Sequence, residues 1–93
     1  MSYLTATWYT MVEEKIGIID HYFTNINVAA IKITAGQLKI GDTVRFVGAP
    51  TDFTQKIDHM EINRQSVSVA NPGDAIGIKV INRVRENGLV YKI

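Results

Sequence analysis

Short runs of alternating apolar and polar residues, separated by turn-forming residues, dominate this chain of 93 residues. In the clearest run, Ile76, Ile78 and Val80 occupy every second position. Val44 and Phe46 alternate with polar neighbours in the same way. A period of two is typical of a β-strand with one buried face, and no stretch shows a convincing helical period. The alternation therefore predicts an all-β fold.

Other segments add strands and the turns between them. The runs "GIIDHYF" and "NVAAIKI" flank the turn-prone "TNIN" and predict a hairpin. In "DFTQKIDHMEI" the apolar residues change parity near Asp58 and His59, which predicts a β-bulge or sharp bend. With "QSVSV" and "LVYKI", about six or seven strands are expected. We predict a small closed antiparallel β-barrel, because closure removes exposed sheet edges.

The phrases "LKIGDTVRF" and "NPGDAIGIKV" place Gly-Asp before a strand at two positions. Pro72 suits the second position of a type II turn, and Gly73 can adopt the positive φ that comes next. Asp74 can then accept a hydrogen bond from a turn amide, and Gly41 and Asp42 repeat the arrangement. We interpret the similarity of the two phrases as shared turn chemistry rather than as a repeat architecture.

Length and composition predict one globular domain. Hydrophobic residues make up 46% of the chain and charged residues 20%, as in an ordinary folded protein. We expect residues 12–93 to form one barrel and residues 1–11 to form a leader. Trp8, Tyr9 and Met11 of this leader can pack on the barrel, pair with another copy or dock on a partner, and packing on the barrel is the expectation.

The cysteine count and the distribution of apolar residues favour a cytoplasmic protein. The chain has no cysteine, which excludes disulfides and thiolate metal sites and fits a reducing compartment. No apolar stretch approaches the roughly 20 residues that span a bilayer, and "MSYLTATWYT" lacks the features of a signal peptide. We therefore expect no membrane association.

The charge balance limits nucleic-acid binding to a local surface. The formal net charge is only +1, from ten basic and nine acidic side chains, so the chain lacks the strong positive field of a tight phosphate binder. The densest basic segment, "KVINRVRENG", contains Lys79, Arg83 and Arg85, and Lys56 and Arg64 flank another segment. A merely solvated charged face is the alternative interpretation.

Motifs for catalysis, metal binding and cofactor binding are not found in the sequence. There is no G-x-x-x-x-G-K-[ST] loop and hence no GTPase signature, and the serines of "QSVSV" lack a nucleophile elbow. His21 and His59 each neighbour an aspartate, but successive strand side chains point to opposite faces and cannot form a charge-relay pair. The sequence therefore predicts a protein that is not an enzyme and holds no metal or cofactor.

Aromatic residues divide between a predicted core and one exposed position. Phe46, Phe53 and Tyr91 lie among alternating apolar residues and are expected in the core. Tyr22 and Phe23 are adjacent, so one of them faces solvent. An exposed ring beside a basic residue could stack on a base, although barrel packing is the simpler interpretation.

From about Val12 to Ile93, the chain resembles domain 2 of translational GTPases of the elongation factor Tu and initiation factor two type. It resembles short free-standing translation elongation factor-like proteins still more closely. The "K-x-G-D" and "A-x-x-G-D-x-x-G" phrases carry this resemblance through Lys39, Gly41, Asp42, Ala70, Gly73, Asp74 and Gly77. The segment "GAPTDFTQ", centred on Asp52, Phe53, Thr54 and Gln55, also resembles the C-terminal accessory barrel of collagenase-like peptidases.

The translational resemblance implies a contact module that performs no chemistry. In the GTPases this barrel touches ribosomal RNA, and in elongation factor Tu it helps to hold the aminoacylated end of transfer RNA. The acidic residue that meets the terminal adenosine there corresponds to His59 before Met60, so binding of the transfer-RNA end is not carried over. An imidazole can still hydrogen-bond to a base or stack on it.

Two functions therefore compete. The first is a non-catalytic, translation-related module that contacts RNA or the ribosome through Lys56, His59, Arg64, Arg83 and Arg85. The second is a protein-interaction module. It would serve a separately encoded enzyme, as in the collagenase-like peptidases, or associate with itself through the leader.

Overall fold

A computed structural model describes residues 13–93, and these residues form ten β-strands without a helix. The prediction of an all-β fold is therefore confirmed. None of these residues belongs to a helix that is long and apolar enough to cross a bilayer. The strands are β1 (Glu14–Phe23), β2 (Val28–Ile33), β3 (Leu38–Lys39), β4 (Thr43–Val47), β5 (Asp52–Lys56), β6 (Met60–Ile62), β7 (Gln65–Val67), β8 (Val69–Ala70), β9 (Ala75–Lys79) and β10 (Leu89–Lys92).

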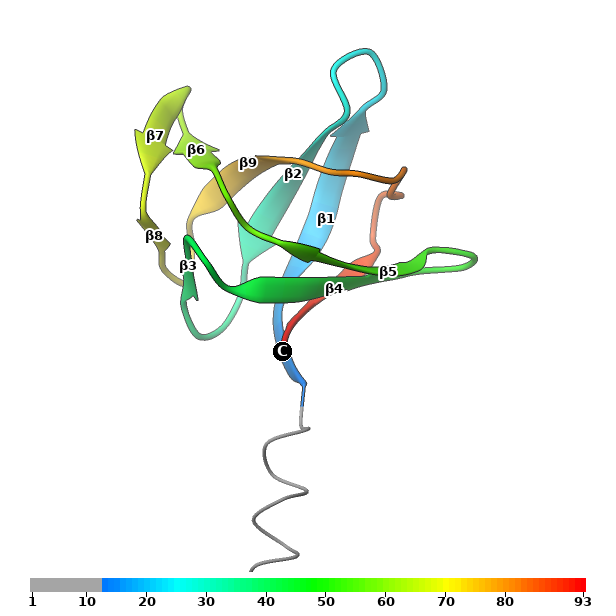
Figure 1. Cartoon of the computed structure of the whole chain (residues 1–93), viewed down its shortest axis with the longest axis horizontal. Coiled ribbons are helices and arrows are strands. Elements are labelled where there is room, and N and C mark those ends of the chain that lie inside the picture. Colours follow the sequence, from blue (N-terminus) through cyan, green and yellow to red (C-terminus); the bar gives the residue numbers. More distant parts are fainter. Residues whose placement is uncertain (1–12) are drawn as a thin grey trace, which may run out of the picture.

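Eight strands form one antiparallel sheet in the order β5-β4-β10-β1-β2-β9-β6-β7, and β3 pairs with β8 in a second, two-stranded sheet. The large sheet curls around a central core, with β3 and β8 beside it (Figure 1). Its two edges, β5 and β7, do not pair with each other. The sheet is thus an open, curled half-barrel, and the prediction of a closed barrel of six or seven strands is wrong in closure and in strand number.

Hydrogen bonds made by Gln55 link the edge strand β5 to the end of β9, a strand with which it does not pair. Its side-chain amide donates to the carbonyl of Lys79 at 2.7 Å, and its carbonyl oxygen accepts the Ile81 N–H at 2.9 Å. These are the kinds of backbone groups that a paired strand would use. One side chain therefore provides the hydrogen bonds between β5 and the end of β9 that backbone groups would provide in a paired strand.

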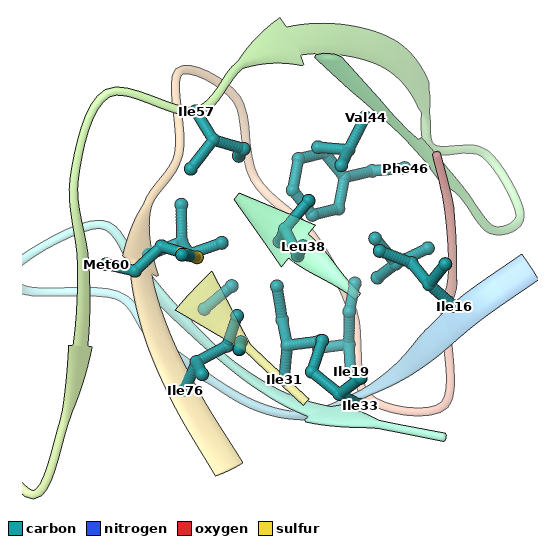
Figure 2. Packing of buried hydrophobic residues seen from close by; sticks show 14 of the residues in the cluster. Ile16, Ile19, Ile31, Ile33, Leu38, Val44, Phe46, Ile57, Met60 and Ile76 are labelled. Carbon is teal, nitrogen blue, oxygen red and sulfur yellow. The ribbon is translucent and has the colours of Figure 1, made fainter. Parts of the chain in front are cut away.

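The segment after β5 also differs from the predicted single bent strand. β5 and β6 are separate strands near opposite ends of the sheet order, joined by residues 57–59. Ile57 and Met60, on either side of Asp58 and His59, are both fully buried and point into the core (Figure 2). The apolar positions thus change parity because the chain leaves β5 and crosses to β6 here. "QSVSV" is likewise divided, because a bend at Ser68 separates β7 from β8.

The predicted hairpin is confirmed. β1 and β2 pair antiparallel from Gly17 opposite Ile33 to Phe23 opposite Val28, around the turn at residues 24–27. The register of β1 shifts between Ile19 and His21, where it pairs with β2. Bulges of this kind bend a strand and increase its twist, which lets β1 follow the curl of the sheet.

The two Gly-Asp turns have the same hydrogen bonds. The Asp42 carboxylate accepts the Lys39 N–H at 2.9 Å, and the Asp74 carboxylate accepts the Asn71 N–H at 2.7 Å. In each turn the aspartate N–H also donates to the carbonyl three residues earlier, at 3.0 Å. The glycine before each aspartate has a positive φ, 97° and 94°. The predicted turn chemistry is therefore confirmed at both positions.

Each turn is also tied to one distant, buried isoleucine. The glycine N–H of the first turn donates to Ile57, whose N–H donates to the Asp42 carbonyl, both at 2.8 Å. The second turn exchanges the equivalent bonds with Ile33, at 2.8 and 2.9 Å. Both isoleucine side chains are fully buried. The hydrogen bonds of the two turns therefore hold the backbone of Ile57 and Ile33 in place, and with it the position of two core side chains.

The core consists of aliphatic side chains around Phe46, with no buried polar or charged residue in the part of the chain that the structure describes. Side chains from β1, β2, β3, β4, β6, β9 and the 57–59 segment point toward this centre (Figure 2). Phe53 and Tyr22 pack against it, while Tyr91 is only half-buried and not part of the cluster. Phe23 is 45% exposed, as expected for one of the adjacent aromatic pair.

The predicted leader, residues 1–11 with Trp8, Tyr9 and Met11, lies outside the described residues. Its boundary with the barrel, and its packing on the barrel, on another copy or on a partner, therefore remain predictions.

Candidate functional site

Two of the five predicted site residues, Lys56 and His59, line the same groove. It has a volume of about 460 Å³ and lies between the end of β5, the linker that follows and the end of β9. The Gln55 hydrogen bonds to residues 79 and 81 hold the two sides together. The groove is present because β5 and β9 approach without pairing. Its lining is Gln55, Lys56, Asp58, His59, Ile78, Lys79, Val80 and Ile81.

A second hollow extends this groove along β9. Its volume is about 210 Å³, and His59 and Lys79 line both hollows. Glu61, also in its lining, lies with its carboxylate oxygen 2.9 Å from His59 Nε2. Two lysines, a histidine and two acidic residues therefore surround the combined groove, which gives it a mixed charge.

Arg83 and Arg85 do not line this groove but lie beside the β1–β2 hairpin, a few residues beyond Ile81, which does line it. They line a hollow of about 210 Å³ together with Tyr22 and Thr24. The Arg83 guanidinium carbon is 6.0 Å from the centroid of the Tyr22 ring, at the outer limit of a cation–π contact. These arginines were predicted on a local surface, but their place beside Tyr22 was not predicted.

Arg64 occupies a third place, the tight turn between β6 and β7, where its φ is 65°. This turn and the segment that follows β9 lie on opposite sides of the view in Figure 1. The structure therefore places Lys56 with His59, Arg83 with Arg85, and Arg64 separately. The five residues thus lie in two different hollows and one turn rather than in a single pocket.

Three exposed apolar side chains lie near the hairpin, and two of them, Ile26 and Ile81, were not predicted from the sequence, whereas exposure of Phe23 or its neighbour Tyr22 was expected. Phe23 is 45%, Ile26 58% and Ile81 69% exposed to solvent. The available signals were an isoleucine inside a polar turn and an isoleucine directly after the alternating run that ends at Val80. A hollow of about 490 Å³, lined by residues 21–26, lies on the same hairpin.

Each histidine pairs with a glutamate rather than with the aspartate next to it. His21 Nδ1 is 2.9 Å from the Glu86 carboxylate, and His59 pairs with Glu61 at the same distance. Both pairs are exposed. Within residues 13–93, no group of three or more His, Cys, Asp or Glu side chains could hold a metal ion.

Arg45 forms the strongest ionic network in the described residues. Its guanidinium binds Asp52 through two hydrogen bonds, at 2.7 and 2.8 Å, and contacts Glu13 at 3.1 Å. The hydrogen bonds that Arg45 donates to Asp52 and then to Glu13 raise the pKa of Arg45, and the hydrogen bond that Asp52 accepts from Arg45 lowers the pKa of Asp52. The network joins β4, β5 and the residue before β1, so its role is structural.

Together, the fold and surface define a small all-β module. It offers a groove beside an edge strand and a basic hairpin end with exposed apolar side chains.

The chain belongs to the family of elongation factor Tu domain 2, whose family model matches residues 27–85. The predicted relation to this barrel is thereby confirmed. The matched region runs from the end of the β1–β2 turn to the segment between β9 and β10.

The curated relatives are peptidases. An uncharacterized protease of Methanocaldococcus jannaschii is 33% identical over 87 residues, which cover 92% of this chain and 21% of the relative. A collagenase of Porphyromonas gingivalis is 33% identical over 72 residues, which cover 76% of this chain and 20% of the collagenase. The chain therefore spans about a fifth of the length of the curated relatives it matches.

A solved structure shows the same fold. The C-terminal domain of a Geobacillus thermoleovorans protein described as a U32 peptidase superposes with a TM-score of 0.80 at 22% identity, covering 86% of this chain and 92% of that domain. These relatives and this structure come from peptidases and not from translation factors. They support the accessory-module interpretation better than a role in translation or RNA binding. The greatest likeness was expected to free-standing translation factors, and the relatives above are peptidases instead.

Proposed function

We propose that this chain is a non-catalytic accessory module that binds the catalytic part of a separately encoded, collagenase-like peptidase. The observation that carries this proposal is the match of 92% of the chain to about a fifth of a much longer protease. A segment that makes up so small a share of an enzyme is more consistent with an appended module than with its catalytic centre.

The surface described above supports the same function. Both histidines form two-residue pairs with glutamate, and neither pair has a third hydrogen-bonded side chain among the described residues. Arg83 and Arg85, which form no ion pair within residues 13–93, lie near exposed apolar side chains, and this combination is more typical of a protein interface than of a phosphate-binding surface. The five predicted RNA-contacting residues do not share one hollow, which gives the competing function less support.

Affinity capture from a lysate of the source organism tests the proposal. The tagged chain is the bait, domain 2 of elongation factor Tu is the fold-matched control bait, and recovered proteins are identified by mass spectrometry. We expect a U32-type peptidase with this chain, but not with the control, both before and after ribonuclease treatment. A tagged copy of that peptidase should recover the chain in return.

Salt dependence separates the two candidate functions. Phosphate-led RNA binding weakens steeply as salt rises, whereas a protein contact with an apolar component weakens far less. Recovery of ribosomal components that disappear after ribonuclease treatment, without a peptidase, would contradict the accessory function. Equal recovery of the peptidase by both baits would contradict it too, because the contact would then reflect the shared fold.

A further inference from the structure

The segment between β9 and β10 runs along the β1–β2 hairpin and is attached to it at several points. The Val80 N–H donates to the Asn27 carbonyl at 2.8 Å, at the start of the segment. At its end, Ile19 exchanges two backbone hydrogen bonds with Asn87 and Gly88, at 2.8 and 2.9 Å. His21 contacts Glu86 between these points. The two segments therefore share one end of the molecule, at the top and right of Figure 1.

Apolar side chains gather at this end. Phe23, Ile26 and Ile81 are three of the six exposed large hydrophobic residues in the described part of the chain. Ile26 and Ile81 adjoin, along the chain, the hydrogen-bonded pair of Asn27 and Val80. Single exposed apolar residues are common, but a group of them beside hollows marks an interaction surface. Phe23 and Ile26 line the hollow of about 490 Å³, and Ile81 lines the groove of about 460 Å³ described above.

The charges at this end favour an acidic partner. Arg83 and Arg85 form no ion pair with any residue of the range 13–93. Glu86, which lines the same hollow as the arginines, contacts His21 and forms no ion pair with either of them. The arginines are therefore available to carboxylates from outside, and Arg residues beside aromatic and apolar side chains are enriched at protein interfaces.

We propose that this hairpin surface, formed by Phe23, Ile26, Ile81, Arg83 and Arg85, binds a protein segment in which acidic residues lie beside apolar ones. The apolar side chains of the partner would cover Phe23, Ile26 and Ile81, while its carboxylates would bind the two arginines. The identification of the partner as a peptidase rests on the proposed function. The chemistry of the surface does not.

Nuclear magnetic resonance titrations of the full chain test the chemistry. The probes are a synthetic peptide of alternating glutamate and leucine, the same peptide with lysine in place of glutamate, and an oligouridylate. We expect the glutamate peptide to shift backbone amides in residues 22–27 and 80–86, and to bind more tightly than either other probe. Equal binding of the two peptides, shifts confined to other residues, or tighter binding of the oligouridylate at these amides would overturn the proposal.

Paired variants give the second test. The double variant Arg83→Glu with Arg85→Glu should weaken binding of the glutamate peptide at least about tenfold, and its control, Lys32→Glu with Arg64→Glu, by less than about twofold. The control makes the same change of charge on exposed residues elsewhere in the molecule. An unchanged affinity for the Arg83 and Arg85 variant would overturn the proposal.

A further pair of variants addresses the apolar contacts. Phe23→Ser with Ile81→Ser should also weaken binding at least about tenfold, whereas Ile40→Ser with Val69→Ser should have little effect. Ile40 and Val69 are the matched control because they are exposed apolar residues at the ends of β3 and β8. Equal losses in the two pairs would overturn the proposed location.

The affinity capture separates this proposal from the proposed function. If a peptidase is captured equally by the wild-type chain and the Arg83 and Arg85 variant, the surface is wrong and the accessory function stands. If the glutamate peptide binds as expected but no peptidase is captured, the accessory function is wrong and the chemistry of the surface stands.

Discussion

Replacing Gln55 tests whether one side chain links the edge of the sheet to β9. Gln55→Ala removes two hydrogen bonds, 2.7 Å to the Lys79 carbonyl and 2.9 Å from the Ile81 N–H. A typical intramolecular hydrogen bond contributes roughly 0.5–1.5 kcal/mol to the free energy of unfolding. Because Gln55 is half-buried, water can partly replace the lost partners, so we expect a total loss of about 1–2 kcal/mol.

Urea denaturation and thermal melting measure this loss, with Thr54→Ala as the control. Thr54 is the exposed neighbour on β5 and makes no side-chain hydrogen bond within the described residues, so its replacement reports the cost of alanine on this strand. For a domain of this size, each kcal/mol corresponds to about 4–8 °C in Tm. Amide hydrogen exchange at Ile81 should also become faster in Gln55→Ala, because its acceptor is gone.

Gln55→Glu sharpens the test, because glutamate keeps the size of glutamine. An ionised carboxylate still accepts from Ile81 but opposes the Lys79 carbonyl, whereas a protonated carboxyl group can donate to it. The folded state then favours the protonated form, so the deficit relative to the wild type should shrink as the pH falls. The reasoning is refuted if Gln55→Ala and Thr54→Ala unfold within about 0.5 kcal/mol of each other and Ile81 exchanges at the wild-type rate.

Three further predictions concern the turns, the ionic network and the core. Gly73→Ala should cost about 1–2 kcal/mol in urea denaturation, because φ is 94° there, whereas Gly48→Ala, which lacks a positive φ, should cost less. The folded-state pKa of Asp52 lies below its ordinary value because of Arg45, so the contact stabilises the fold above that value and is lost as the pH falls through the folded-state pKa. The difference in stability between the wild type and Asp52→Asn should therefore vanish in acid, and a constant difference from neutral to acidic pH would contradict the assignment. Phe46→Ala should cost about 3–5 kcal/mol and yield little folded protein by circular dichroism, and a normal melting curve would contradict its central place in the core.

Local chemistry made the turns and the hairpin predictable from the sequence. Asp42 and Asp74 accept hydrogen bonds from amides only three residues away, so the short phrases contain everything that the turns need. The alternation around Val44 and Ile76 likewise depends only on which face of one strand is buried. Both features were therefore visible without knowledge of distant parts of the chain.

The edge of the sheet depends on contacts between distant segments and was not predictable in the same way. Gln55 bonds to backbone groups 24 and 26 residues away, and no sequence period signals such a contact. The parity change between Ile57 and Met60 indicated that the chain altered direction, but not that it passed to another part of the sheet. For the candidate site, charge alone selected Arg83 and Arg85, whereas their exposed apolar neighbours required coordinates.

The aliphatic interior has a consequence for where such a module can operate. Among residues 13–93 the buried side chains carry no ionisable group, and the chain has no thiol, so acidity does not change the charge of this core and no disulfide can form in it. Met60 contains the one sulfur atom within the buried cluster, and its thioether is enclosed by hydrocarbon. A module with such a core can therefore keep the same interior at different pH values and redox potentials, while only its surface residues change with the partner.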